Sequence, residues 1–277
     1  MKTQFLKSIK DILTSGEQAN LKEIREYEIG QVLSLLPQRS TILEIGAGAG
    51  WQAKLLAEKG FIVTAIDLSK SEYEIKRVYP IIEYDGMHIP FPDKYFDVVF
   101  SSNVLEHVPN IKDFLVEIKR VLKRGGLAIC LLPTGSWRLF TNISYYLFLV
   151  KRFLNFLLIH AETSSEVKSK TEQRAKKLNI LHKVRNLFPF CHGVTGNFVS
   201  EVYLFSKFRW KKLFRDTGWI VKFHLPNRLF YTGHSILGLA LNIKSRVLAS
   251  YILGSSCHIF LLKTNSIETI KEDGKTK

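Results

Sequence analysis

The first half of the chain alternates short apolar runs with stretches of helical length. Apolar runs at 42–45, 61–66 and 81–84 predict three buried strands. Between the first two, the pattern predicts a helix over Trp51–Lys59 that ends at Gly60. Strands that alternate with helices form a mostly parallel sheet with helices on its faces. The pattern therefore predicts an α/β fold.

The second half contains a long amphipathic segment, Leu139–Ile159. In a helix over this segment, apolar side chains recur every three or four residues and form one stripe. The stripe comprises Leu139, Ile143, Tyr146, Leu147, Val150, Leu154, Leu157 and Leu158, and the other side carries Thr141, Tyr145, Arg152 and Asn155. Because Lys151 and Arg152 interrupt the segment, contact with a membrane surface, or packing on the core or another subunit, is favoured over a membrane span.

The remaining elements surround a second amphipathic stretch, Ser235–Leu253. A helix capped by Ser200 is expected to run to Gly218 and lead into a strand over Trp219–Leu225. A last strand is expected at Cys257–Lys263. The N-terminal residues 1–16 form a candidate amphipathic helix without the apolar core of a signal peptide, and 264–277 is expected to be a flexible tail.

Charge separates the two halves of the chain. Residues 1–135 carry 17 basic and 17 acidic side chains, whereas residues 136–277 carry 23 basic and 8 acidic ones, so the net charge of +15 lies entirely in the second half. Much of it falls in the polar run 161–187, which is either a solvated surface or a segment that attracts anionic lipid headgroups. The second half must therefore be interpreted separately from the first.

Length and cysteine content narrow the class of protein. A chain of 277 residues that is 46% hydrophobic can bury one good core and an appended subdomain. Its three cysteines lie far apart, which indicates neither a zinc site nor a disulfide framework. We therefore expect no metal and a cytoplasmic protein.

The strongest chemical signal is the glycine turn after the first strand. Glycines at 46, 48 and 50 flank Ala47 and Ala49, and a helix begins at Trp51. Such a strand–glycine–helix unit lets the backbone approach a nucleotide-like ligand closely. A dinucleotide site requires G-x-G-x-x-G, and Trp51 occupies the position of its third glycine, which argues against a nicotinamide oxidoreductase. Glu44, just before the turn, suits an ammonium group, so S-adenosylmethionine fits better.

Two further acids follow the next two strands. Asp67 lies at the spacing where a carboxylate accepts hydrogen bonds from both ribose hydroxyls. Asp85 follows the third strand, where it would accept from the exocyclic amine of adenine while Met87 packs on the ring. Three acids at the ends of three consecutive strands, around a glycine turn, form a specific set.

These motifs resemble the class I S-adenosylmethionine-dependent methyltransferases, in particular the group that includes ubiquinone and menaquinone biosynthesis enzymes. The matching stretches are LEIGAGAG (43–50), AIDLS (65–69), DGMHIPFPDKYFDVVFSSNVLEHV (85–108) and VLKRGGLAICLLP (121–133). The resemblance implies a Rossmann-like, mostly parallel seven-stranded sheet flanked by helices, here with amphipathic helical insertions. It covers about a third of the chain and is nearly silent on the acceptor.

The resemblance also assigns cofactor-binding positions. The glycine turn and Glu44 hold the methionine end, Asp67 the ribose, and Asp85 the adenine, and Asn103 lines the methionine end. The expected cofactor-binding set is Glu44, Gly46, Ala47, Gly48, Gly50, Asp67, Leu68, Asp85, Gly86, Met87 and Asn103.

Catalytic groups are harder to identify. An alcohol or phenol acceptor requires a general base, and histidine is the commonest one. His192 lies in a glycine-bearing loop after the first insertion, where a substrate lid would close, and is the candidate base. His107, which also occurs in the family pattern, is expected to have a structural role.

The sequence thus predicts a methyltransferase organised in five segments. They are an N-terminal helical segment (1–36), the cofactor-binding core (37–135), an amphipathic and basic insertion or lid (136–199), the rest of the core (200–263, with a helical insertion at 226–256) and the tail (264–277). The expected acceptor is a small or lipid-linked molecule, met at the inner face of a membrane. A nucleic-acid methyltransferase and a non-catalytic scaffold are the alternatives, and the absence of a Pro-Pro or Pro-Cys motif disfavours the former. The oligomeric state is left open.

Overall fold

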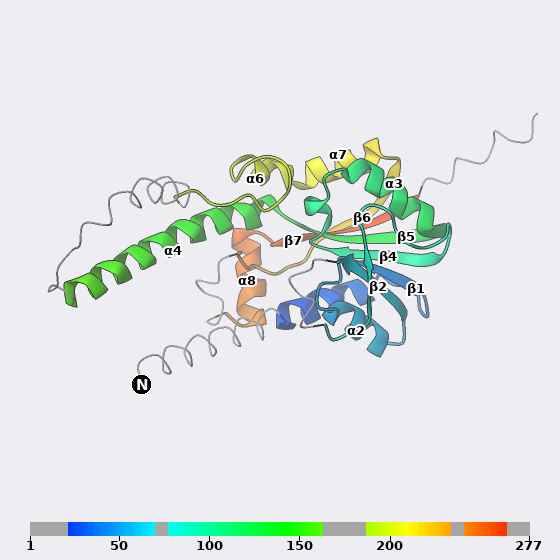
Figure 1. Cartoon of the computed structure of the whole chain (residues 1–277), viewed down its shortest axis with the longest axis horizontal. Helices are drawn as coiled ribbons and strands as arrows, with labels where there is room; N and C mark the ends of the chain where they lie inside the picture. Colours follow the sequence, from blue (N-terminus) through cyan, green and yellow to red (C-terminus); the bar gives the residue numbers. More distant parts are fainter. Residues whose placement is uncertain (1–21, 70–76, 163–186, 234–240, 265–277) are drawn as a thin grey trace, which may run out of the picture.

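The structure is a computed structural model that describes residues 22–69, 77–162, 187–233 and 241–264. One sheet runs through the molecule, with helices on both of its faces (Figure 1). Its seven strands have the order β3-β2-β1-β4-β5-β7-β6. Six strands run in the same direction and β7 is antiparallel to both of its neighbours, which confirms the predicted Rossmann-like, mostly parallel sheet.

The five strands whose positions the sequence predicts begin and end close to those positions. Their bounds are β1 Thr41–Ile45, β2 Ile62–Leu68, β3 Ile81–Tyr84, β4 Phe96–Ser102, β5 Leu122–Pro133, β6 Trp219–Pro226 and β7 Cys257–Thr264. The order reverses at β1, whose neighbours are β2 and β4. In open α/β sheets the carboxyl ends of the strands at such a reversal form the ligand-binding crevice. The topology therefore places the predicted glycine turn at the expected ligand-binding edge.

Successive side chains of the central strands point to opposite faces of the sheet and build two cores. On one face, Ile42 and Phe100 pack with residues of the helix at 22–33 and of α2 (Trp51–Glu58). On the other face, Leu43 and Val99 pack with α3 (Ile111–Val121) and α7 (Lys207–Asp216). Both faces are thus covered, which explains why the strands read as continuous apolar runs.

The predicted single helix from 200 to 218 is wrong. The segment contains two helices, α6 (Ser200–Leu204) and α7, which are separated at Phe205 and Ser206. The Ser206 hydroxyl caps α7 by accepting from the Arg209 N–H at 3.3 Å. At the start of α6, the side chain of Asn197 accepts from the Ser200 N–H, so Ser200 is not the cap.

Helix α4 (Gly135–Glu162) contains the predicted amphipathic segment but packs with its polar side. Thr141 and Tyr145 are 5% and 6% exposed, whereas Leu147 and Leu154 of the predicted apolar stripe are 57% and 52% exposed. The alternative in which this stripe packs on the protein's own core is therefore wrong for the side chains that the structure describes. No helix of the described residues is both long and apolar enough to cross a membrane.

The described part of the second amphipathic stretch, residues 241–253, is also reversed, whereas 235–240 lie outside the described residues. Within the described part, α8 (Ile243–Leu253) buries Arg246 and Ser250 and exposes Leu248, Tyr251 and Ile252, the last at 82%. Three expectations lie outside the described residues: the amphipathic N-terminus at 1–16, most of the basic run 161–187, and the tail from 265.

Candidate active site

The glycine turn between β1 and α2 is held by hydrogen bonds to β2. The N–H groups of Gly46 and Ala47 donate to the Ile66 carbonyl at 2.9 and 3.1 Å. The Asp67 carboxylate accepts from the Gly48 N–H at 2.7 Å. Gly46 adopts φ +70°, and a Cβ there would collide with Val104, so only glycine fits. The predicted residues of the turn and Asp67 are therefore in contact.

Glu44 lies beneath this turn and is 1% exposed. It accepts a backbone hydrogen bond from Ala53 at the start of α2, but Oε2 has no hydrogen-bond partner in the described part of the chain. Burial raises the pKa of this carboxyl to about 8, against an ordinary value of 4.5. An unpartnered buried carboxylate oxygen is a ready acceptor for a ligand's ammonium group.

The acid–glycine pair after β3 forms a local turn. Asp85 accepts from the N–H groups of Met87 and His88 at 2.8 and 2.7 Å, and its other oxygen lies 2.7 Å from the His88 ring. These hydrogen bonds lower the pKa of the exposed Asp85 carboxyl to about 2. Gly86 adopts φ +88°, and a Cβ there would lie 2.9 Å from the half-exposed Leu68 side chain. Leu68 and the predicted adenine-binding turn are thus adjacent.

Asn103, at the end of β4, is joined to a residue that the sequence did not single out. With its amide oriented so that the oxygen faces Arg25, it accepts from Nη1 and Nη2 of the guanidinium, at 2.8 and 3.3 Å. Arg25 lies on the helix at 22–33, donates to Ser102 Oγ at 3.4 Å and interacts electrostatically with Glu44. In sequence it resembles one of many surface cations, and only the topology brings it to the edge beside Glu44.

A carboxylate and two histidines form a cluster after β4. Glu106 and His107 lie in the short 3₁₀ turn Leu105–His107. Glu106 Oε1 lies 3.5 Å from His192 Nε2 and 3.8 Å from His107 Nε2, and the two rings are 4.7 Å apart. The structure thus brings the candidate base next to a buried acid. Potential ligand atoms of the three lie within 4.8 Å of one another, close enough to share a cation.

The loop that carries His192 is anchored by a buried ion pair. Arg138 of α4 and Glu201 of α6 are joined at 2.7 Å and are 2% and 0% exposed. Glu201 also accepts from the N–H groups of His192 and Gly193 at 2.8 and 2.7 Å. The His192 ring packs edge-on against Trp137, with centroids 4.6 Å apart. The imidazole is therefore held in a fixed place.

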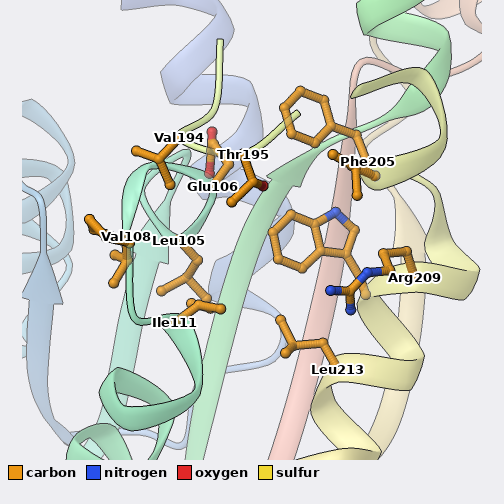
Figure 2. Close-up of a pocket in the computed structure, with 12 residues that line it drawn as sticks. Leu105, Glu106, Val108, Ile111, Val194, Thr195, Phe205, Arg209 and Leu213 are labelled. Atoms are coloured by element: carbon orange, nitrogen blue, oxygen red, sulfur yellow. The ribbon is translucent and has the colours of Figure 1, made fainter. Parts of the chain in front are cut away.

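A small pocket of about 100 Å³ lies next to this cluster, between the loop after β4 and helices α6 and α7 (Figure 2). Its walls are largely apolar, and Leu105, Val108 and Phe205 are among them. Glu106 and Trp210 line it, and both Glu106 oxygens and the Trp210 Nε1 have no hydrogen-bond partner among the described residues. The pocket thus combines an apolar wall with a few buried polar groups, as small-molecule sites do.

Comparison with known proteins identifies the domain. Residues 43–130 match the family model described as a methyltransferase domain. The ubiquinone biosynthesis O-methyltransferase of Rickettsia prowazekii (strain Madrid E) is 38% identical over 130 residues, which are 42% of this chain and 51% of that protein. The chain thus spans about half the length of this curated relative. Residues 43–130 are a methyltransferase domain.

Solved structures share the fold over nearly the whole chain. One of them is the putative methyltransferase solved in a complex with the Haloferax volcanii Trm112 methyltransferase activator. Its alignment covers 94% of this chain and 97% of that chain, with a TM-score of 0.55 at 14% identity. A SAM-dependent methyltransferase of Thermotoga maritima, described as a possible histamine N-methyltransferase, covers 95% of this chain and 97% of its own, with a TM-score of 0.50 at 16% identity. At these identities the similarity concerns the fold alone.

Replacing Glu44 tests the environment at the turn. In the unfolded chain this carboxyl ionises near its ordinary pKa, whereas in the folded protein it stays protonated up to about pH 8. Its burial therefore costs increasing stability as the pH rises between these values. The unfolding free energy of Glu44→Gln minus that of the wild type should therefore increase by roughly 2–4 kcal/mol when the pH is raised from 4 to 8.5. Urea denaturation at both pH values measures this, and a difference that does not change with pH would contradict the assignment.

Proposed function

We propose that this protein transfers the methyl group of S-adenosylmethionine to a small or lipid-linked acceptor. The observation that carries the proposal is the left-handed glycine turn with Glu44, Asp67 and Asp85 at the carboxyl ends of β1, β2 and β3. Bound S-adenosylmethionine would supply an electrophilic methyl group on a sulfonium centre. Glu44 would accept from its ammonium group, Asp67 from the ribose hydroxyls, and the turn at Asp85 would hold the adenine next to Leu68 and Met87.

Arg25 completes this arrangement at the methionine end. Its guanidinium lies beside Ser102 and Asn103 at the end of β4, the strand that pairs with β1, and it interacts with Glu44. A guanidinium is the side chain best suited to bind a carboxylate. Arg25 and Glu44 would thus hold the two opposite charges of the amino-acid end of the cofactor.

The cofactor assignment is tested by ligand affinity. Asp67→Asn keeps an oxygen that accepts from the Gly48 N–H but removes the negative charge that attracts the ribose hydroxyls. Affinity for S-adenosylhomocysteine, measured by isothermal titration, should fall about 10- to 100-fold while the melting temperature changes little. As a control, Asp216→Asn alters an exposed acid at the end of α7 and should leave affinity unchanged. Tight binding of NAD by the wild type, or unchanged affinity in Asp67→Asn, would refute the assignment.

For a hydroxyl acceptor, His192 would be the general base. Its Nε2 faces the buried Glu106 carboxylate, so Nδ1 is the atom that would take the acceptor proton, and Glu106 would stabilise the resulting imidazolium. The acceptor oxygen would then bond to the methyl carbon while the bond between that carbon and sulfur breaks, which releases the neutral thioether S-adenosylhomocysteine. Much of the rate would come from holding these atoms in line.

His192→Ala should lower turnover by roughly 10²–10⁴-fold without changing the affinity for S-adenosylhomocysteine. The assay follows transfer of labelled methyl from S-adenosylmethionine to an acceptor that the wild type methylates, such as a short-chain prenylated catechol. Cys191→Ala, an exposed neighbour in the same loop, is the matched control and should retain turnover.

The same assay separates a base from a metal ligand, because Glu106, His107 and His192 are spaced closely enough to share a cation. Dialysis against EDTA should leave turnover unchanged if His192 acts as a base. Loss of turnover that a divalent metal restores would contradict that role, as would full activity of His192→Ala.

Two helices support a peripheral site of action at the inner face of a membrane. Both α4 and α8 bury polar side chains against the protein and expose apolar ones, and large exposed apolar patches mark interaction sites. Only Thr134 separates α4 from β5, so α4 leaves the sheet at the carboxyl edge that carries the glycine turn (Figure 1). A membrane that covers α4 would therefore lie close to the active-site edge, where a lipid-linked quinol precursor can reach it. The name of the Rickettsia relative supports a quinone-type acceptor.

Vesicle cosedimentation tests this proposal. The wild type should bind vesicles of phosphatidylcholine with phosphatidylglycerol, and less so as salt rises, because screening weakens the attraction of the basic half to anionic headgroups. Leu147→Ser together with Leu154→Ser should release the protein at any salt concentration, since each buried leucine contributes about 1.5–3 kcal/mol.

The matched control changes two apolar side chains that are also exposed but lie elsewhere, Ile62 at 65% and Val116 at 59%. Ile62→Ser together with Val116→Ser should leave vesicle binding unchanged. If the pair of serines on α4 preserves vesicle binding but dissociates a dimer in light scattering, the stripe is a protein–protein surface and the membrane proposal fails.

A further inference from the structure

A closed ring of polar contacts connects the helix at 22–33, the end of β4 and the segment after β6. Its centre is the Glu28 carboxylate, which is fully buried. Glu28 accepts from Arg25 Nη1 at 2.7 Å with one oxygen, and from Asn227 Nδ2 and Tyr231 Oη at 2.8 and 3.0 Å with the other. A buried carboxylate with three donors is well compensated.

The ring closes through Cys257 and Asn103. Tyr231 Oη lies 3.0 Å from Cys257 Sγ, which lies 3.4 Å from the Asn103 amide, and the other end of that amide accepts from Arg25. Burial raises the pKa of both Tyr231 and Cys257, so the phenol and the thiol keep their protons and act as donors. Each member thus restricts the orientation of the next, and Arg25 is the member that interacts electrostatically with Glu44.

This arrangement bears on how Arg25 can bind a second carboxylate. A lone Glu28 would form a bidentate pair with Arg25 and occupy the planar fork of the guanidinium. Because Tyr231 and Asn227 hold the second Glu28 oxygen, only one oxygen contacts Arg25. Glu28 therefore contacts Nη1 alone, Ser102 and Asn103 accept from the same side of the guanidinium, and its remaining N–H groups can point to the edge of the site.

We infer that Tyr231 is a positioning residue that acts through Glu28 to direct Arg25 toward the carboxylate of an amino-acid-bearing nucleoside. This inference rests on the proposed S-adenosylmethionine site. It assigns a binding function to the segment between β6 and β7, which supplies Asn227 and Tyr231. Without the Tyr231 hydroxyl, Glu28 turns onto Arg25 and competes with the ligand carboxylate.

The test compares two ligands that share a nucleoside. S-adenosylhomocysteine carries the amino-acid end, and 5′-methylthioadenosine lacks it. By isothermal titration of the full chain, Arg25→Gln should weaken S-adenosylhomocysteine about 10- to 100-fold, and Tyr231→Phe about 3- to 10-fold. Both variants should bind 5′-methylthioadenosine within about twofold of the wild type, and the double variant should be no weaker than Arg25→Gln because the two residues act in one chain.

Tyr79→Phe is the matched control. It removes a phenol hydrogen bond of 2.9 Å to the Val63 carbonyl, and neither residue belongs to the ring of polar contacts. Any change in affinity that it causes should be the same for S-adenosylhomocysteine and 5′-methylthioadenosine. If Tyr231→Phe does not fold, Asn227→Ala replaces it: it removes the other donor to the same Glu28 oxygen, so the same ligand-selective loss is expected.

An equal loss for both ligands, unchanged affinity in Tyr231→Phe, or an additive double variant would overturn the inference while the cofactor assignment stands. A wild type that binds neither ligand would instead refute the proposed function.

Discussion

The site depends on how β2 holds the turn that follows β1. Ile66 offers its carbonyl and Asp67 its carboxylate to three consecutive N–H groups of the turn, at Gly46, Ala47 and Gly48. These contacts fix a left-handed backbone at the point where the strand order reverses. Asp67 itself is held in place, because its two carboxylate oxygens accept from the Gly48 and Leu68 N–H groups, both at 2.7 Å.

Four buried glutamates lie at or near this edge, and their partners differ. Glu28 and Glu201 each form an ion pair with an arginine and accept further hydrogen bonds, so burial of their charge is compensated. Glu44 and Glu106 have no arginine partner among the described ion pairs: Glu44 Oε2 has no hydrogen bond, and Glu106 faces only the His107 and His192 rings, at 3.8 and 3.5 Å. Burying an unpaired polar group is costly, and such groups concentrate at functional sites. The contrast separates the two acids that are paired with arginine from the two that we propose face a ligand.

The sequence predicted the cofactor half well because its signals are local. Apolar runs, a glycine turn and acids after strands all lie within short windows, and the structure brings Gly48 into contact with Asp67 as expected. The sequence could not predict that Arg25 lies at the site, because this residue contacts Asn103 only through the packing of the helix at 22–33 on the sheet. The break between α6 and α7 was missed because Phe205 and Ser206 continue a helical pattern, while the Ser206 cap becomes evident only in the structure.

The reversed polarity of α4 has the same origin. Periodicity finds an apolar stripe but does not say which side of a helix meets the protein. Here Arg138 and Thr141 determine the orientation, because Arg138 pairs with the buried Glu201 and Thr141 Oγ1 accepts from the Gly233 N–H at 3.0 Å. If the helix were rotated to bury its leucines, these polar groups would lose their hydrogen-bond partners, at a cost of several kcal/mol. The same ion pair also fixes the His192 loop. The contacts that expose the apolar face of α4 thus also position the candidate base, so surface and site follow from one buried pair.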